Sequence, residues 1–586
     1  MTFNELRKNL KKDFKGFKTL KLSLLGDSAT QFLAQAIRGA GYEQQLDIDI
    51  YEADYNQTDR LIFDLGSELY EFGPNITLIF EAGHKLLQKF NKTEEGARSH
   101  FADDQLDRIR QLVDMLQGHL KTKIVFFNYA EEDDAVFGNF ANKVTSSFVY
   151  QVRRLNYLLA EYAVENPNFY IADMVSIQNR LGHGRLFSPT IYTTSDMVLS
   201  IDALPTVAES IVRMVAAFQG KQKKCLILDL DNTVWGGVIG DDGIENIQIG
   251  SLGIGKAFTE FQHWVKKLRQ RGIIVCVCSK NTESIAKEPF EKHPDMVLRL
   301  DDIAVFVANW ENKADNIRRI QQFLNIGFDS MVFLDDNPAE RDIVRQNVPD
   351  ITVPELPEDP AEYLEYLYTL HLFETVSYSL EDVNRTEQYQ NESRRITAQA
   401  SFTNESDFLQ SLDMLSCVQP FDAFATPRVA QLSQRSNQFN LRTVRYSEED
   451  VIRIRESLAH HSFCFTLEDK YGDNGTVCVV VLQEQRPEEL FIENWFMSCR
   501  VLKRGMEQFV LNTIVEHAKE NGYSSIVGEY LPTEKNVLVK DHYSSLGFKE
   551  DGKFWRLDVT EFESKECHIR AKSSKGMRDY GKIGSH

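Results

Sequence analysis

The chain has 586 residues, of which 42% are hydrophobic and 26% are charged, the balance of a soluble globular protein with several domains. Its net charge of −21 argues against nucleic acid or an anionic membrane as a partner. No apolar run reaches the roughly 18 residues of a membrane span. The basic start of the chain lacks the apolar core of a signal peptide, so we expect a cytoplasmic protein.

The first part of the chain, residues 1–220, alternates short apolar runs with helical stretches. The runs are KTLKLSLLGD, LDIDIYEA, NITLIFEAG, KTKIVFFNYA and NFYIADMV. Strands that alternate with helices predict an α/β domain with a parallel sheet covered on both faces.

A second α/β series fills residues 221–360. Its predicted strands are CLILDLD, IIVCVCSK, MVLRL, MVFLDDN and ITV, continuously apolar as in a sheet that is buried on both faces. The cysteines in these runs indicate reduced core residues and no disulfide framework.

Three further segments complete the predicted organisation. Residues 361–400 are predicted as a helical connector and residues 401–562 as a mixed α+β domain. The basic tail, residues 563–586, is predicted to be disordered. The fold class is therefore multidomain α/β.

Acidic residues follow the first strand of the second series. Asp229 and Asp231 come at the end of CLILDL, where the carboxyl ends of parallel strands open into a ligand crevice. Two converging carboxylates suggest a bound cation, and Mg²⁺ suits carboxylates combined with water and phosphate. An aspartate can attack phosphorus as a nucleophile, and a second aspartate can act as acid and base.

Other predicted strand ends supply matching groups. Ser279, Lys280 and Asn281 offer a hydroxyl and amides to a phosphoryl group, and Thr233 can hold the turn. Lys313 offers a positive charge for the transition state, and the pair Asp335–Asp336 offers further metal ligands. A single strand-end Asp is more often a helix cap and a single Lys is usually solvated, but the ordered set predicts a phosphoryl-transfer site.

This set resembles the haloacid dehalogenase (HAD) superfamily. The segments CLILDLDNTVWGGVIGDDGIENIQIG, VCSKN, NWENKADNIR and FLDDNPAERDIVRQNVPD resemble the FkbH family more closely, and the resemblance continues to YSSLGF. It implies Asp229 as nucleophile, Asp231 as acid and base, Ser279 and Lys313 as phosphate-binding groups, and Asp335 or Asp336 as metal ligand. The short segments between these motifs leave no room for a full cap domain, and an open crevice would admit a carrier protein.

The C-terminal domain resembles the GNAT acyltransferase fold, which implies a site for coenzyme A or phosphopantetheine. Arg500, Arg504 and Gly505 stand in the loop that cradles a pyrophosphate in that fold, where Lys503 replaces the first glycine of the pattern. Tyr543, in YSSLGF, is a candidate acid, and Cys499 is a candidate acyl-accepting thiol beside a cation. The alternative for Tyr543 and Cys499 is ordinary packing in the core.

The segment LSLLGDSATQF near the N-terminus resembles the first block of SGNH hydrolases, which implies Ser28 as a nucleophile. The required Asp-x-x-His is absent, although His183 is present. Because a hydroxyl without its base is a poor nucleophile, we interpret the domain as degenerate and used for binding.

FkbH proteins are implied to take a glyceryl unit from a phosphorylated three-carbon donor and to load it on an acyl carrier protein. The first hypothesis is therefore a phosphatase coupled to acyl transfer. The alternative is a plain phosphohydrolase of a sugar or another small phosphorylated molecule, with binding-only flanking domains. The third hypothesis is a non-catalytic scaffold, and the complete acidic set argues against it.

Overall fold

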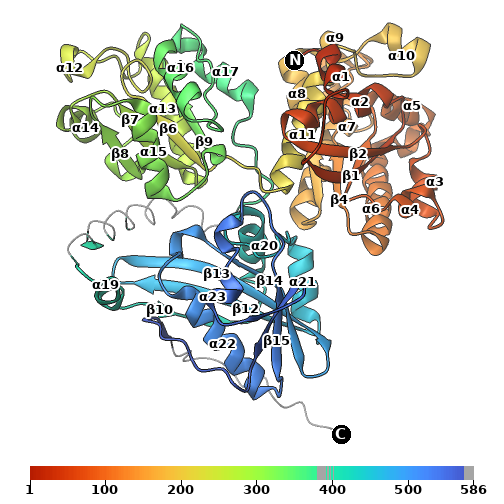
Figure 1. Cartoon of the computed structure of the whole chain (residues 1–586). Helices are drawn as coiled ribbons and strands as arrows, with labels where there is room; N and C mark the ends of the chain where they lie inside the picture. Colours follow the sequence, from red (N-terminus) through yellow and green to blue (C-terminus); the bar gives the residue numbers. More distant parts are fainter. Residues whose placement is uncertain (379–390, 392–394, 396–397, 400–401, 573–586) are drawn as a thin grey trace. The chain divides into compact units, whose positions relative to one another are not determined.

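The computed structural model describes residues 1–378, 391, 395, 398–399 and 402–572. The chain forms two compact units, Met1–Ala216 and Ala217–His586. The second unit contains two separate sheets, so that three sheets are present in the described part of the chain (Figure 1). None of the described helices combines the length and the apolar character that crossing a bilayer needs.

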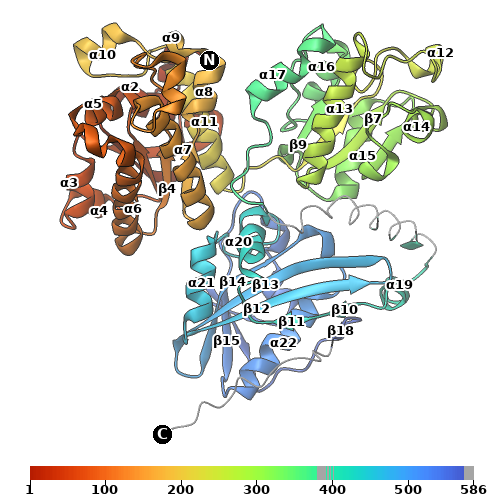
Figure 2. The same ribbon diagram turned by 180° about the vertical axis from the view of Figure 1, so that it is seen from behind.

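The N-terminal unit is a doubly wound α/β domain. Its parallel sheet has the order β2-β1-β3-β4-β5, the flavodoxin-like arrangement. The strands are β1 (Lys18–Gly26), β2 (Leu46–Glu52), β3 (Ile76–Phe80), β4 (Lys123–Phe127) and β5 (Phe169–Ala172). Two long helices, α6 (Phe101–His119) and α7 (Phe148–Glu165), cover one face and stand in front of the sheet in Figure 2.

The central domain holds a parallel sheet of order β8-β7-β6-β9. Its strands are β6 (Cys225–Leu228), β7 (Ile274–Ser279), β8 (Val305–Ala308) and β9 (Met331–Leu334). Alternate residues of β6 serve different faces. Leu226 and Leu228 pack with α13 (Gly255–Gln270) and α14 (Glu283–Lys292). Cys225 and Ile227 pack with α15 (Lys313–Leu324) and α16 (Pro338–Asn347). Both faces are therefore apolar, as predicted.

The third domain is built on a mixed sheet. The path is β16-β17-β15-β14-β13-β12-β10-β18, and β11 pairs with β12. The bounds are β10 (Leu415–Ser416), β11 (Val418–Gln419), β12 (His460–Asp469), β13 (Gly472–Arg486), β14 (Glu489–Met497), β15 (Ser525–Glu529), β16 (Lys549–Asp551), β17 (Phe554–Asp558) and β18 (Arg570–Ala571). The parallel pairing of β14 with β15 covers only Glu489–Phe491, so the two strands part beyond it.

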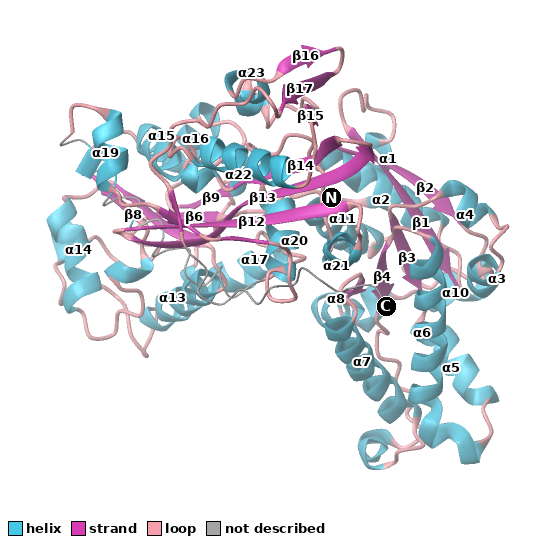
Figure 3. Ribbon diagram, turned by 90° about the horizontal axis from the view of Figure 1, so that it is seen from below, coloured by secondary structure: helices cyan, strands magenta, loops and turns pink. Residues whose placement is uncertain are grey.

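Helices cover both faces of this third sheet. The helix α22 (Met506–Glu520) packs on one face through Leu511 and Ile514. The helices α20 (Thr426–Arg435) and α21 (Glu448–Glu456) pack on the other face. Figure 3 shows α22 along the long strands β12 and β13.

Four predicted segments differ from the structure. The predicted strand ITV, residues 351–353, forms only a single bridge, between Thr352 and Val332. MVLRL, residues 296–300, forms no strand: Met296 and Leu298 are buried in the core, but the edge strand is β8, which follows them. The predicted connector, residues 361–400, begins with α17 (Tyr363–Leu370), which packs into the central core, and much of its remainder lies outside the described residues.

The predicted disordered tail is also wrong for residues 563–572. There Ile569 is buried and β18 pairs with β10, so this segment completes the sheet. The rest of the predicted tail, residues 573–586, lies outside the described residues.

Candidate active site in the central domain

The central site lies at the carboxyl ends of the parallel strands. Asp229 follows β6, Ser279 ends β7, and Asp335 and Asp336 follow β9. Lys313 is the first residue of α15, which begins after β8. The predicted convergence of these strand ends is therefore what the fold produces.

Three carboxylates gather at the centre of this site. One oxygen atom from each of Asp229, Asp335 and Asp336 lies within 4.8 Å of the others. Asp229 and Asp335 are buried, and Lys313 is 3% exposed. The Lys313 Nζ atom lies 2.8 Å from Asp229 Oδ2 and 2.6 Å from Asp335 Oδ2. A buried ammonium group thus bridges two of the three carboxylates.

Burial and neighbouring charges shift the pKa values of Asp335, Asp336 and Lys313. Burial raises the pKa of Asp335 to about 7, and the charge of Asp229 adds to this increase while Lys313 opposes it. Burial and Asp229 also raise the pKa of Asp336. For Lys313, burial lowers the pKa, but the attraction of Asp229 and Asp335 outweighs burial and raises it. Three carboxylates facing one ammonium leave an excess of negative charge that favours a cation.

One oxygen of Asp229 has no hydrogen-bond partner. Its Oδ2 atom is held by Lys313, but Oδ1 is buried and accepts no hydrogen bond from the described residues. An unpaired buried carboxylate oxygen is costly. The residues present therefore fit a divalent cation and a phosphoryl group at this position.

Asp231 is held apart from the carboxylate cluster. Its Oδ1 atom accepts hydrogen bonds from Trp235 Nε1 (3.0 Å) and from the Ile239 amide (3.1 Å). Its Oδ2 atom accepts one from Asn281 Nδ2 (2.9 Å). The structure thus does not bring the Asp231 side chain together with the three carboxylates, although the sequence suggested it as a metal ligand. Its position suits proton transfer instead.

The predicted phosphate-binding residues separate into two groups. Asn281 Nδ2 also donates to Ser279 Oγ (3.2 Å), so these two side chains line the site together. Thr233 Oγ1 accepts a hydrogen bond from the Asp336 amide (3.1 Å) and holds the turn. Lys280, however, turns away and pairs with Glu340 at 2.5 Å. The Lys280 side chain is therefore engaged by Glu340, and the role of residue 280 in phosphate binding stays a prediction.

Sequence reasoning missed two supporting residues. Trp235 supplies the indole hydrogen bond to Asp231. Arg341, which is buried, donates to the carbonyl oxygens of Asp335 (2.8 Å) and Asp336 (2.7 Å) and so fixes the acidic pair. Its place in the first turns of the helix after the acidic pair was the available signal.

The short segment after Asp231 does not form a cap domain. It contains α12 (Ile239–Asp242) and an antiparallel bridge between Gly236 and Gln248. The expected absence of room for a full cap domain is consistent with these short elements, and the open crevice stays a prediction.

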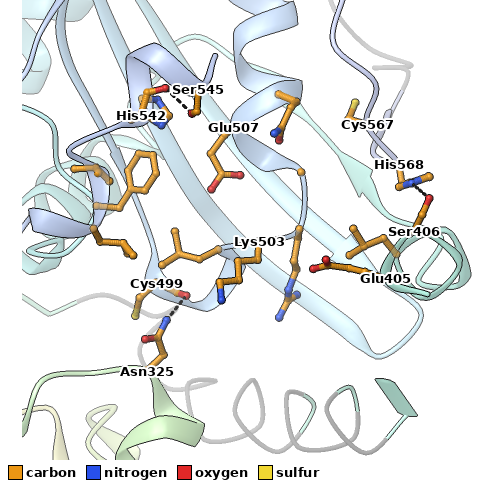
Figure 4. Close-up of a pocket in the computed structure, with 18 of the residues that line it drawn as sticks. Asn325, Glu405, Ser406, Cys499, Lys503, Glu507, His542, Ser545, Cys567 and His568 are labelled. Carbon is orange, nitrogen blue, oxygen red and sulfur yellow. Dashed lines mark hydrogen bonds between the residues drawn. The ribbon is translucent and has the colours of Figure 1, made fainter. Parts of the chain in front are cut away.

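A cavity of about 1200 Å³ is lined by residues of the third domain and by residues 322–325 of the central domain (Figure 4). Its lining includes Cys499, Lys503, Gly505 and His542. Lys503 has φ 62° and Gly505 has φ 80°, so the lysine takes a left-handed conformation where the resemblance expects glycine. Gly505 is the N-cap residue of α22. The predicted loop therefore borders a cavity at the start of a helix.

The other predicted acyl-site residues lie elsewhere or have other partners. Tyr543 is 2% exposed and packs in the hydrophobic core, where burial raises its pKa, and it is not among the residues that line the cavity, so its role as an acid stays a prediction. Arg504 is buried with its Nη1 atom 3.5 Å from Asp469 Oδ2, which directs its charge to an internal carboxylate. The side chain of Arg500 lies outside the described residues.

Ser28 in the N-terminal domain is fully buried, and its Oγ atom has no hydrogen-bond partner among the described residues. His183 instead pairs with Glu132 at 3.0 Å. The described hydrogen bonds thus include none between the two residues of the expected hydrolase site.

Comparisons with known proteins agree with this geometry. The family described as FkbH, N-terminal domain, matches residues 21–216. The crystal structure of the N-terminal part of the protein BF1531 from Bacteroides fragilis, which contains a phosphatase domain complexed with Mg, has 56% sequence identity and a TM-score of 0.63. It covers 64% of this chain and 100% of its own chain. No curated protein matches the chain.

Solved acetyltransferases also match part of the chain. The ribosomal-protein-S18-alanine N-acetyltransferase from Escherichia coli has 13% identity and a TM-score of 0.20, and covers 28% of this chain and 99% of its own. Spermidine N-acetyltransferase from Vibrio cholerae in complex with CoA and spermine has 12% identity and a TM-score of 0.21. It covers 25% of this chain and 96% of its own chain. The GNAT-like fold of the third domain rests on its own strand order and on the parting of β14 and β15.

The fold and the carboxylate–lysine site define the central domain as a phosphatase domain of the HAD type. With the identity to the BF1531 fragment over that fragment's whole length and the N-terminal family match, the chain belongs to the FkbH-like family.

Proposed function

We propose that this protein is a Mg²⁺-dependent phosphatase coupled to acyl transfer. It removes phosphate from a phosphorylated three-carbon, glyceryl-type donor and loads the acyl unit on the thiol of an acyl carrier protein. The observation that carries the phosphatase part is the environment of Asp229, whose Oδ2 is held by Lys313 at 2.8 Å while the buried Oδ1 accepts no hydrogen bond from the described part of the chain.

The carboxylates of Asp229, Asp335 and Asp336 would hold the cation. Oxygen ligands of this kind suit Mg²⁺, and the related BF1531 fragment was crystallised with Mg. When bound, the cation neutralises charge on the phosphoryl group and orients it.

The residues of the chain then divide the chemistry among them. An Asp229 carboxylate oxygen attacks phosphorus, an aspartyl-phosphate forms, and the bond from phosphorus to the leaving oxygen breaks. Asp231, oriented by Trp235 and Asn281, gives a proton to that oxygen and later takes one from the attacking water. Ser279 binds phosphoryl oxygens, and Lys313 balances the negative charge.

Acyl loading is assigned to the third domain. The donor therefore carries two phosphates, a phosphate ester that the central site hydrolyses and an acyl phosphate that it leaves intact. In the loading step a thiolate attacks the carbonyl carbon of the acyl phosphate, the carbon–oxygen bond breaks, and this second phosphate leaves as the thioester forms, with no net oxidation. Cys499 and Lys503 on the cavity wall support the proposal, since a thiol and a cation suit an acyl group and an anionic phosphopantetheine or coenzyme A arm. The N-terminal domain is proposed to bind and not to catalyse.

Incubation of the full chain with Mg²⁺, a phosphorylated glyceryl donor and a phosphopantetheine-bearing carrier protein tests this function. We expect the intact mass of the carrier to increase by one glyceryl unit, with release of phosphate. Cys499→Ser tests the thiol, and Cys417→Ser is the matched control because Cys417 lies in the same domain but not on the cavity. Free phosphate with an unchanged carrier would instead indicate a plain phosphohydrolase.

A further inference from the structure

A cluster of two histidines and a glutamate lies in the N-terminal domain, outside the phosphatase site. One candidate ligand atom from each of His84, Glu132 and His183 lies within 4.8 Å of the others. His84 Nδ1 is 3.0 Å from Glu132 Oε1, and His183 Nε2 is 3.0 Å from Glu132 Oε2. The two imidazoles therefore face the two oxygens of one carboxylate.

The three residues come from segments that follow different strands. His84 is in the first turn of α5 (Gly83–Lys92), after β3. Glu132 is in the loop after β4, and His183 begins α9 (His183–Leu186), after β5. His84 and Glu132 thus follow the carboxyl ends of parallel strands, the side of such a sheet at which ligands bind, and His183 joins them from the end of α8 (Met174–Leu181).

The fold brings these segments unusually close. A Cβ atom on Gly83 would lie 2.7 Å from the Ala130 carbonyl oxygen and 3.2 Å from Glu132 Cγ. Only glycine permits this approach of α5 to the loop of Glu132. The glycine at position 83 therefore allows α5 to lie close to the loop that carries Glu132.

Aromatic rings and an ion pair complete the surroundings. The Phe187 ring lies 4.8 Å from His84 and 5.0 Å from His183, and the Tyr192 ring lies 5.1 Å from His84. These contacts fix the planes of both imidazoles. The neighbouring cation, Lys85, is paired with Asp196 at 2.7 Å and so is neutralised.

Hydrogen bonding satisfies only part of this cluster, because His183 Nε2 pairs with Glu132 Oε2 at 3.0 Å but the other half has no such bond. His84 Nδ1 and Glu132 Oε1 are both buried, yet neither has a hydrogen bond of regular geometry to the described residues, although the two atoms lie 3.0 Å apart. A buried nitrogen and a buried oxygen that lie close together without hydrogen-bond geometry can both be satisfied by coordinating one cation. We propose that His84, Glu132 and His183 form a binding site for a divalent transition metal of the zinc class.

The ligand types select the metal. Imidazole nitrogens suit Zn²⁺ and its neighbours, whereas Mg²⁺ prefers oxygen ligands alone. Two histidines and one glutamate form a three-ligand set that leaves a fourth position on Zn²⁺ for water or a small ligand. The site therefore differs in metal from the all-carboxylate site of the central domain.

Titration of the chelator-treated full chain with Zn²⁺ in excess Mg²⁺ tests this site, because Mg²⁺ fills the carboxylate site. We expect one tight equivalent of Zn²⁺, measured with a competing indicator dye. His84→Ala, Glu132→Ala and His183→Ala should each weaken that equivalent by more than about 10-fold, since even indirect partners of a metal contribute about 10- to 100-fold. His100→Ala is the matched control, because His100 is an exposed histidine of the same domain.

A second measurement needs only the wild-type chain and so does not depend on the folding of variants. Diethylpyrocarbonate modification, mapped by mass spectrometry, should show His84 and His183 protected by Zn²⁺ and His100 unchanged. A wild-type chain that takes up no Zn²⁺ in excess Mg²⁺, or whose His84 and His183 react equally with and without Zn²⁺, would overturn the proposal.

Discussion

Replacement of Asp229 by asparagine isolates the chemistry of the central site from its architecture. The amide has nearly the shape of the carboxylate, so it can still accept a hydrogen bond from Lys313 at the position of Oδ2. Lys313 also keeps its second partner, Asp335, at 2.6 Å. The change therefore removes the nucleophilic oxygen and one negative charge while most of the local contacts remain.

The two consequences differ greatly in size. A hydrogen bond to a charged group contributes about 1.5–3 kcal/mol and a neutral one about 1 kcal/mol, so Asp229→Asn should lower the free energy of unfolding by about 1–2 kcal/mol. Loss of the nucleophile should lower kcat by at least about 1000-fold, which corresponds to about 4 kcal/mol. Because domains have about 5–15 kcal/mol of stability, unfolding would not explain such a loss.

The assay is release of phosphate from an aryl phosphate in the presence of Mg²⁺, combined with rapid acid quenching of the labelled enzyme. The wild-type chain should carry a hydroxylamine-labile phosphate at Asp229, and the variant should not. Asp342→Asn is the control, because Asp342 is an exposed aspartate of the same domain, paired with Arg345 at 3.0 Å. A variant that keeps a tenth of wild-type turnover would refute the assignment of Asp229 as nucleophile.

Three further predictions follow from other contacts. Asp231→Asn should lower kcat by about 10²- to 10⁴-fold with Mg²⁺ affinity nearly unchanged. Asp335→Asn should instead lower the affinity for Mg²⁺ by more than about 10-fold. Calorimetric titration of both variants with Mg²⁺ measures this difference, and equal losses of affinity would contradict the geometry. Burial and Glu81 raise the pKa of Asp27 from 3.8 to about 7. Between these pH values the folded chain holds a proton that the unfolded chain has lost, so the stability of the N-terminal domain should fall as pH rises. Hydrogen exchange of the β1 amides should show this decrease in the wild-type chain and no such decrease in Asp27→Asn. Lys503→Gly should stabilise the third domain by about 1 kcal/mol in urea unfolding, since Lys503 has φ 62°, and a destabilised variant would contradict this account.

The layers of the fold and the main residues of the central site were predictable from the sequence. The apolar residues of β6 serve opposite faces alternately, which requires helices on both sides of the sheet. Polar residues that end parallel strands must meet at one edge. That rule brought Asp229, Asp335 and Asp336 together, and with them Lys313, from segments far apart in the chain.

The directions of side chains depended on the tertiary structure. Asp231 and Lys280 follow strand ends, as the other site residues do, but their side chains have other partners. Trp235 and Asn281 donate hydrogen bonds to Asp231. Lys280 forms an ion pair with Glu340. Tyr543 went to the core because its ring packs against Gly528, whose Cβ would fall 2.3 Å from Tyr543 Cζ. The cluster of His84, Glu132 and His183 had no sequence signal, since its spacing exists only after three strands have aligned. The order of the strands determines where the residues at the strand ends lie. The direction of each side chain depends on the tertiary partner that satisfies its charge or its burial.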